Sequence, residues 1–428
     1  MSSAASNLSA LFIAFLAATT LMRIWLGLRQ VEHVSRHRET VPAAFREVIE
    51  LDAHQKAADY TVARVRLGLL DVAVSALLVA WFTIGGGLQG AFDLWTGLFQ
   101  PGGYAHALAF IGTVSAIGFV VGLPFVLWRT FVIEERFGFN KMTPALFVAD
   151  LLKETLLAVL IGAPVLAAVL WLMAHMGSVW WLYVWLFWLG FNLLVLLIYP
   201  SFIAPLFNKF SPLSDDALRQ RVEALLARCG FRASGLFVMD GSKRSAHGNA
   251  YFTGFGAAKR IVFFDTLLAK LSALEIEAVL AHELGHYKHH HVWQRLGAMG
   301  LASLAFLALL GYLIERPWFF HGLGMTAEGT APALVLFMIA IPVFVFPLSP
   351  LMSGWSRKHE FQADAYAARQ TRREDLVAAL VKLYRDNAST LTPDPLYSAF
   401  HDSHPPAAAR IAHLQAAAAQ PAALVAHA

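Results

Sequence analysis

Long apolar segments alternate with shorter polar segments along this chain of 428 residues. Each apolar run has the ~18 or more residues that a helix needs to cross the hydrocarbon core of a bilayer. The runs cover residues 8–28, 67–88, 106–132, 145–173, 179–203, about 293–314 and 331–351. The pattern predicts an integral membrane protein with seven transmembrane helices.

Composition supports this class and argues against others. Hydrophobic residues make up 57% of the chain and charged residues 14%, whereas soluble domains carry about 25% charged residues. The isoelectric point near 9.1 would also fit nucleic-acid binding. However, the formal charge is only +4 and the basic residues flank the apolar runs, so we expect a lipid bilayer and no nucleic acid as partner. The single cysteine, Cys229, excludes an internal disulfide and a multi-cysteine zinc site.

Positive charge is distributed unequally among the loops, which predicts the orientation in the membrane. The loop after the first run contains Arg29, Arg36, Arg38 and Arg46, whereas residues 89–105 and 174–177 contain no Lys or Arg. By the positive-inside rule the amino terminus lies outside, and the polar segments after residues 205 and 351 lie in the cytoplasm. No basic residue precedes the first run, which disfavours a cleaved signal peptide.

The polar segments predict one small α+β domain built from two pieces of chain. A helix is expected at 215–229, strands at 235–240, 249–253 and 260–264, and turns at 241–243 and 254–256. We divide the chain into residues 1–205 (spans one to five), 206–292 (first part of the domain), 293–351 (spans six and seven) and 352–428 (second part).

The sequence His282-Glu283-Leu284-Gly285-His286 places two histidines one helical turn apart. Both rings can reach one zinc ion, and Glu283 can take the proton of the zinc-bound water as it attacks a carbonyl. The alternative is two solvated histidines on an exposed helix. Ser272 followed by Glu275 is a capping-box signal, and we expect one helix from about 273 to 295 that runs directly into span six.

A third ligand is expected just after span seven. Glu360 and Asp364 are four residues apart, so Glu360 could bind the metal while Asp364 accepts the free ring N–H of a ligand histidine. The alternative is a solvated acidic pair on a surface helix. We place the histidines at 289, 290 and 291 at the membrane interface, and His359 faces about 100° away from Glu360. Nothing local requires a role for His247 or His404.

With these motifs the chain resembles the CAAX prenyl protease 1 family of integral-membrane zinc metallopeptidases, and we expect a prokaryotic member. The similarity runs from about residue 50 to 414 and includes segments well outside the zinc motif. They are QKAADY at 55–60, FVIEERFGFNK at 131–141, IAPLFNKF at 203–210, SKRSAHGNAYF at 242–252, EFQAD at 360–364 and SHPP at 403–406. One departure is Gly248, where eukaryotic members often have Ser.

The resemblance implies seven helices around a chamber and a gluzincin-like domain at its cytoplasmic end, in the inner (plasma) membrane if the source is bacterial. It implies one Zn²⁺ per chain held by His282, His286 and Glu360, with Asp364 as their hydrogen-bond partner. It further implies three catalytic groups, with Glu283 as general base and His404 and Arg410 stabilising the oxyanion. Substrate peptides, including prenylated ones, would bind near His247 and add as a strand along Asn249, Ala250, Tyr251 and Phe252.

Two other classes share some of these features. An HtpX-like quality-control protease has the same catalytic motifs but fewer spans, so the five early runs disfavour it. A transporter or scaffold with a structural zinc would need ionisable residues near the middle of its spans. In the first five spans these residues sit toward the ends. We therefore expect a zinc metalloendopeptidase.

Overall fold

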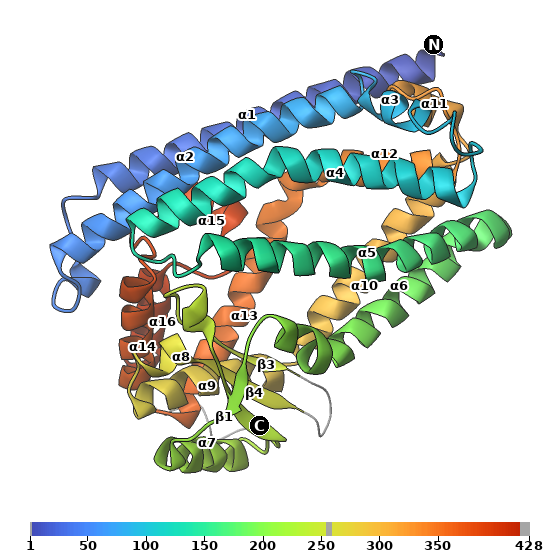
Figure 1. Cartoon of the computed structure of the whole chain (residues 1–428). Helices are drawn as coiled ribbons and strands as arrows, with labels where there is room; N and C mark the ends of the chain where they lie inside the picture. Colours follow the sequence, from blue (N-terminus) through green and yellow to red (C-terminus); the bar gives the residue numbers. More distant parts are fainter. Residues whose placement is uncertain (1, 254–258, 420–428) are drawn as a thin grey trace, which may run out of the picture.

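The computed structural model describes residues 2–253 and 259–419, and within them seven helical segments are long and apolar enough to cross a membrane (Figure 1). This confirms the predicted number of spans. Their helices are α1 (Ser3–Arg36), α2 (Leu51–Phe82), α4 (Tyr104–Trp128), α5 (Pro144–His175), α6 (Trp180–Ile198), α10 (His291–Leu313) and, as one broken span, α12 (Thr330–Val345) with α13 (Ser349–Gln370). The predicted turn at 254–256 lies outside the described residues.

Short elements join or extend the spans. A π-helical segment, η2 (Arg129–Glu134), prolongs α4, and the 3-10 segment η8 (Phe346–Leu348), which contains Pro347, joins α12 to α13. Two short helices, α3 (Gly87–Asp93) and α11 (Pro317–Gly322), lie near the amino terminus (Figure 1). Leucines such as Leu77 and Leu152 are about two-thirds exposed, as expected for a surface that faces lipid.

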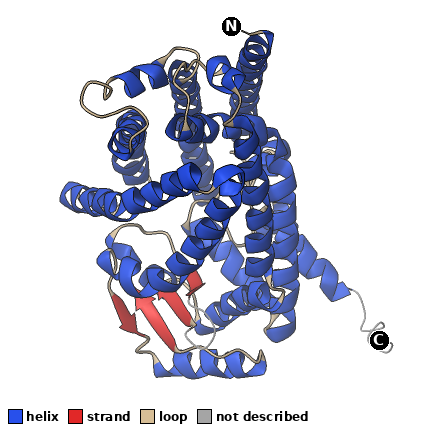
Figure 2. Cartoon of the chain, turned by 90° about the vertical axis from the view of Figure 1, so that its right-hand side faces the viewer, coloured by secondary structure: helices blue, strands red, loops and turns tan. Residues whose placement is uncertain are grey.

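A small sheet and its helices form the domain after span five (Figure 2). The strands are β1 (Phe210–Pro212), β2 (Gly235–Met239), β3 (Ala250–Thr253) and β4 (Arg260–Phe264), in the order β1-β2-β4-β3. Only β2 and β4 are parallel, and in the described part of the chain β3 pairs with β4 alone, so β3 is an edge strand. The three expected strands are confirmed, whereas the short strand β1 was not predicted.

Helices from both polar segments build the core of this domain. They are α7 (Asp216–Arg228), α8 (Asp265–Leu268), α9 (Ala273–Lys288), α14 (Arg373–Asp386), α15 (Pro395–His401) and α16 (Ala407–Ala419). Buried Val222 and Leu280 pack in one cluster with Ala367 near the end of α13 and Leu376 of α14. One hydrophobic core therefore unites two pieces of chain that are separated by two spans.

The prediction of one helix from 273 to 295 running into the membrane is wrong. The capping box at Ser272 is present and α9 begins as expected, but α9 ends at Lys288. His290 has φ 56°, in the left-handed region that interrupts a helix, and α10 begins at His291. The side chain of Gln294 donates to the carbonyl of His289 (2.9 Å), which satisfies a backbone group released by the break.

Helices α9 and α13 pack closely at Gly285. A Cβ atom at this position would lie 2.8 Å from the Cα of Ala363 and 3.0 Å from its carbonyl oxygen. Real Cβ contacts are not this short, so only glycine lets the two helices lie at this distance.

Gly285→Ala should therefore force α9 away from α13. The expected cost is about 1–3 kcal/mol, the usual range for overpacking a tight interior, seen as a lower apparent Tm of the purified protein in detergent. Gly297→Ala on α10 is the matched control, because a Cβ there meets no atom within 4 Å. Equal Tm values for the two variants would contradict this account of the contact.

Candidate metal centre

The structure brings together the three residues predicted to bind a metal. The Nε2 atoms of His282 and His286 are 3.2 Å apart, and the carboxylate oxygens of Glu360 lie 3.4 Å from the former and 3.3 Å from the latter. A tetrahedral zinc with bonds of 2.0–2.1 Å separates its ligand atoms by about 3.3 Å. Glu360 is 2% exposed, and its Oε2 has no hydrogen-bond partner among the described residues. Donor chemistry, spacing and this unsatisfied oxygen all fit a zinc ion.

The remaining ring nitrogen of His282 is held by a buried acid. Nδ1 donates to Oδ1 of Asp364 (2.8 Å), which leaves Nε2 free to face the metal position. Asp364 in turn accepts two hydrogen bonds from Arg410, at 2.8 and 2.5 Å. This is the geometry that the predicted role of Asp364 requires.

The resemblance implies that Arg410 stabilises an oxyanion, whereas its main contacts in the structure are with Asp364. Its guanidinium is 6% exposed and forms a bidentate pair with Asp364, and only Nη1 is directed toward Glu360, at 3.8 Å. Its main contacts therefore position the carboxylates of the site. Of the guanidinium nitrogens, only Nη1 is free to donate to an oxyanion, because Nε and Nη2 donate to Asp364.

His291 holds the second ligand histidine, and the prediction that it lies at the membrane interface is wrong. It is 1% exposed, its Nδ1 accepts from Nδ1 of His286 (3.0 Å), and its Nε2 donates to Oε1 of Gln362 (2.9 Å). This chain of hydrogen bonds directs Nε2 of His286 toward the metal position. A single continuous helix would have turned residue 291 away from residue 286, so the break at His290 creates this contact.

His359 does not join the metal-binding group. Its ring stacks on His291 with centroids 3.9 Å apart, and its Nε2 lies 3.1 Å from Oε1 of Gln294. It is 2% exposed, so it packs behind the site and supports the His291 ring.

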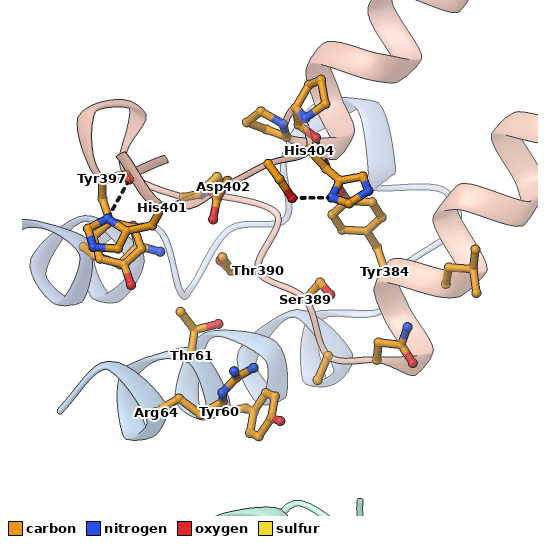
Figure 3. Close-up of a pocket in the computed structure, with 18 of the residues that line it drawn as sticks. Tyr60, Thr61, Arg64, Tyr384, Ser389, Thr390, Tyr397, His401, Asp402 and His404 are labelled. Atoms are coloured by element: carbon orange, nitrogen blue, oxygen red, sulfur yellow. Dashed lines mark hydrogen bonds between the residues drawn. The ribbon is translucent and has the colours of Figure 1, made fainter. Parts of the chain in front are cut away.

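A cavity of about 960 Å³ opens onto the site. Figure 3 shows part of its lining, including His404. Glu283 and His404 line it together with His282 and Glu360. In the described part of the chain Glu283 has no hydrogen-bond or ion-pair partner, so its carboxylate is available to a reactant. His404 lies 3.5 Å from Glu360 through Nε2, and the Ser403 hydroxyl lies 3.0 Å from its Nδ1.

The first residues of the edge strand reach the same cavity. Asn249 and Ala250 line it, whereas Tyr251 and Phe252 do not, and Phe252 packs on Phe231 in the core. His247 is also absent from the described cavity lining. Its ring stacks on Phe139 (centroids 4.5 Å apart) and lies 3.5 Å from Oε2 of Glu134 and 3.2 Å from Oδ1 of Asn387. The side chain predicted to bind substrate thus connects the segment before β3 to the end of η2 and the residues that follow it.

Protonation of the site is governed by the carboxylates around His282. Burial disfavours the charged ring, but hydrogen bonds to Asp364 and Glu360 outweigh this effect and raise the pKa of His282 to about 9. Solvent reaches the His404 ring inside the cavity, yet the protein atoms crowded around it lower the pKa of this ring, which favours its neutral form.

Comparison with known proteins assigns this site and its membrane helices to one class. A family model described as "CAAX prenyl protease N-terminal, five membrane helices" matches residues 30–209, and "Peptidase family M48" matches residues 212–418. The chain is thus a membrane-embedded metalloendopeptidase.

Individual relatives narrow the class to a family. The chain is 37% identical to a CAAX prenyl protease 1 homolog of Arabidopsis thaliana, covering 93% of this chain and 95% of that one. It is 39% identical to CAAX prenyl protease 1 of Saccharomyces cerevisiae, covering 72% of each. The crystal structure of S. mikatae Ste24p superimposes with a TM-score of 0.87 at 33% identity, covering 95% of this chain and 98% of that one. This chain belongs to the CAAX prenyl protease 1 family.

Metal affinity should depend on pH because of His282. Below about pH 9 its ring is protonated in the metal-free protein, and metal binding must displace that proton. The apparent zinc affinity should therefore rise by roughly tenfold per pH unit up to about pH 9 and level off above it. Competition titrations with a chelator of known pH dependence would measure this. An affinity that stays flat between about pH 7 and 9 would contradict it.

Proposed function

We propose that this chain, with one zinc ion bound, cleaves peptide bonds near the carboxyl terminus of membrane-associated peptides, including prenylated ones. The name shared by its relatives supports this substrate class. The main support is the carboxylate of Glu283, which lines the cavity beside His282 and has no hydrogen-bond or ion-pair partner among the described residues. In a host without protein prenylation, the substrates would be other membrane-associated or misfolded chains. The match to the five membrane helices favours this function over the HtpX-like alternative.

His282, His286 and Glu360 would hold the zinc ion, which supplies Lewis-acid chemistry and a lowered water pKa when bound. Glu283 then removes a proton from the attacking water as general base and passes it to the leaving nitrogen.

His404 is placed to stabilise the oxyanion of the tetrahedral intermediate. If the Ser403 hydroxyl donates to Nδ1 of the neutral ring, Nε2 carries the proton and can donate to the oxyanion. Nη1 of Arg410 is the second candidate donor. The other guanidinium nitrogens are occupied by Asp364.

An extended peptide would pair with the free edge of β3 along the backbone of residues 249–252. Two observations support this: the edge is unpaired among the described strands, and Asn249 and Ala250 line the cavity that contains Glu283. His247 would act by holding this strand in place.

We also propose that the amino terminus lies outside and the peptidase domain on the cytoplasmic side. The distribution of Lys and Arg among the loops supports this orientation. The division of the chain after residues 205, 292 and 351, which rests on the change from apolar to polar composition, is part of this proposal.

Glu283→Gln should keep the metal and lose cleavage, because the amide preserves the size of the side chain but cannot accept the proton. A drop of at least about 10²-fold in kcat is expected, the lower end of what a positioned base contributes. Peptide cleavage by the purified variant measures this, with zinc content as the control for an intact site. Cleavage at the wild-type rate would exclude the proposed base.

Metal analysis should find one zinc per chain in the purified protein. His282→Ala or His286→Ala should remove it, because each leaves only two protein ligands. Lys288→Ala is the matched control, since Lys288 is exposed on the same helix but lies outside the metal-binding group. Retention of full zinc content by His282→Ala would overturn the ligand assignment.

A further inference from the structure

The part of the cavity away from the metal ligands is lined by hydrogen-bond donors from three elements. Arg23 and Gln30 come from α1, Arg64 from α2, and Tyr397 and His401 from α15. None of them takes part in the catalytic scheme above. All line the same continuous cavity as Glu283.

The two donors on α1 have unused N–H groups. The Arg23 guanidinium lies over the Phe346 ring at 4.1 Å, its Nε is buried without a partner, and no described residue accepts a hydrogen bond from it. Gln30 is 3% exposed. Its Oε1 accepts from the backbone N–H of Asp394 (2.7 Å), which fixes the amide, while its Nε2 has no partner in the described part of the chain.

Arg64 likewise has no ion-pair partner among the described residues, and Figure 3 shows its guanidinium pointing from α2 into the cavity. Its Cζ lies 5.4 Å from the centre of the Tyr60 ring, and no carboxylate of the described residues lies within ion-pair distance. Other arginines nearby are paired: Arg29 with Asp394 at 2.9 Å and Arg38 with Asp59 at 2.8 Å. Arg23 and Arg64 therefore differ from these two arginines, because neither has a carboxylate partner among the described residues.

An unpaired cation within a membrane span is costly, so such residues usually face a cavity and bind something there. Two acids also line this region, Asp71 and Asp402, but neither lies within ion-pair distance of either arginine. Asp71 accepts from Ser75 (3.5 Å). Burial raises the pKa of Asp402, which makes its carboxylate less able to neutralise a nearby arginine. The cluster consequently has spare donors and spare positive charge.

We propose that Arg23, Arg64 and Gln30 bind the free α-carboxylate of the substrate peptide. This inference rests on the proposed function, because the peptide must have its scissile bond beside Glu283. A carboxylate presents two coplanar oxygens that match the fork of a guanidinium. Binding the chain end in the cavity that holds Glu283 would select peptides by the distance of the cleaved bond from the carboxyl terminus. Lipid phosphates share the anionic chemistry, and the test separates the two sources.

The test compares two peptides of identical sequence, one with a free carboxyl terminus and one with a carboxamide. The wild-type enzyme in detergent should cleave the acid with a kcat/KM roughly 10- to 100-fold higher, the range for charged hydrogen bonds. In Arg23→Gln and Arg64→Gln this ratio should fall toward one. Arg66→Gln, on the same helix but outside the described cavity lining, should keep the wild-type ratio.

A binding measurement separates recognition of the carboxylate from effects of the substitutions on catalysis or folding. In the Glu283→Gln background, the acid should bind more tightly than the amide, and adding Arg64→Gln should remove the difference while zinc content stays at one per chain. Equal wild-type kcat/KM and Kd for the two peptides would overturn the carboxylate site but leave the proposed function intact. Cleavage of neither peptide would count against the proposed function, and the Kd values would still decide the carboxylate site.

Binding of lipid phosphate is tested with dihexanoyl phosphatidylglycerol as a soluble competitor of the peptides. Competition that requires Arg23 and Arg64, combined with equal binding of acid and amide, would assign the cluster to lipid phosphate and overturn the proposal.

Discussion

The metal-binding geometry depends on how closely α9 approaches α13. Two of the three ligands, His282 and His286, lie on α9 and the third, Glu360, lies on α13. Gly285 lies between the two histidines and sets the distance, because any Cβ there would collide with Ala363. The glycine inside the motif is therefore part of the metal centre through steric exclusion, although it supplies no ligand atom. Chemistry alone would allow any small residue at this position.

Hydrogen bonds behind the ligands complete the geometry. Asp364 and His291 each hold the far nitrogen of one ligand histidine, so both rings present Nε2 to the same point. The cost of burying Glu360, Asp364 and Arg410 together is offset mainly by their mutual charge and hydrogen bonding. A divalent ion would add a further counter-charge to this group. Such a buried network favours one arrangement of side chains, which suits a site that must not relax between turnovers.

The sequence predicted those features that depend on local periodicity. Long apolar runs predicted the spans, the capping box at Ser272 predicted the start of α9, and the four-residue spacing of Glu360 and Asp364 predicted their shared face. It failed at His290, because a single residue in the left-handed region leaves no periodic signal, and with it the buried role of His291 was missed. A histidine five residues after His286 would have been the available clue. The sequence also could not predict that Arg23 and Arg64 lack ion-pair partners, since ion pairing depends on residues far away in the sequence.

The peptidase domain and the membrane helices form the site jointly. Arg244 makes two hydrogen bonds to Asp150 of α5 (2.8 and 3.0 Å), and Tyr60 of α2 donates to Glu134 at the end of η2 (2.6 Å). Glu134 in turn lies beside His247, which precedes the edge strand. The strand position is thereby fixed relative to α2, the helix that carries Arg64. A peptide lying between β3 and α2 would touch both parts at once, so movement of the spans would alter the substrate path as directly as a change at the metal ligands.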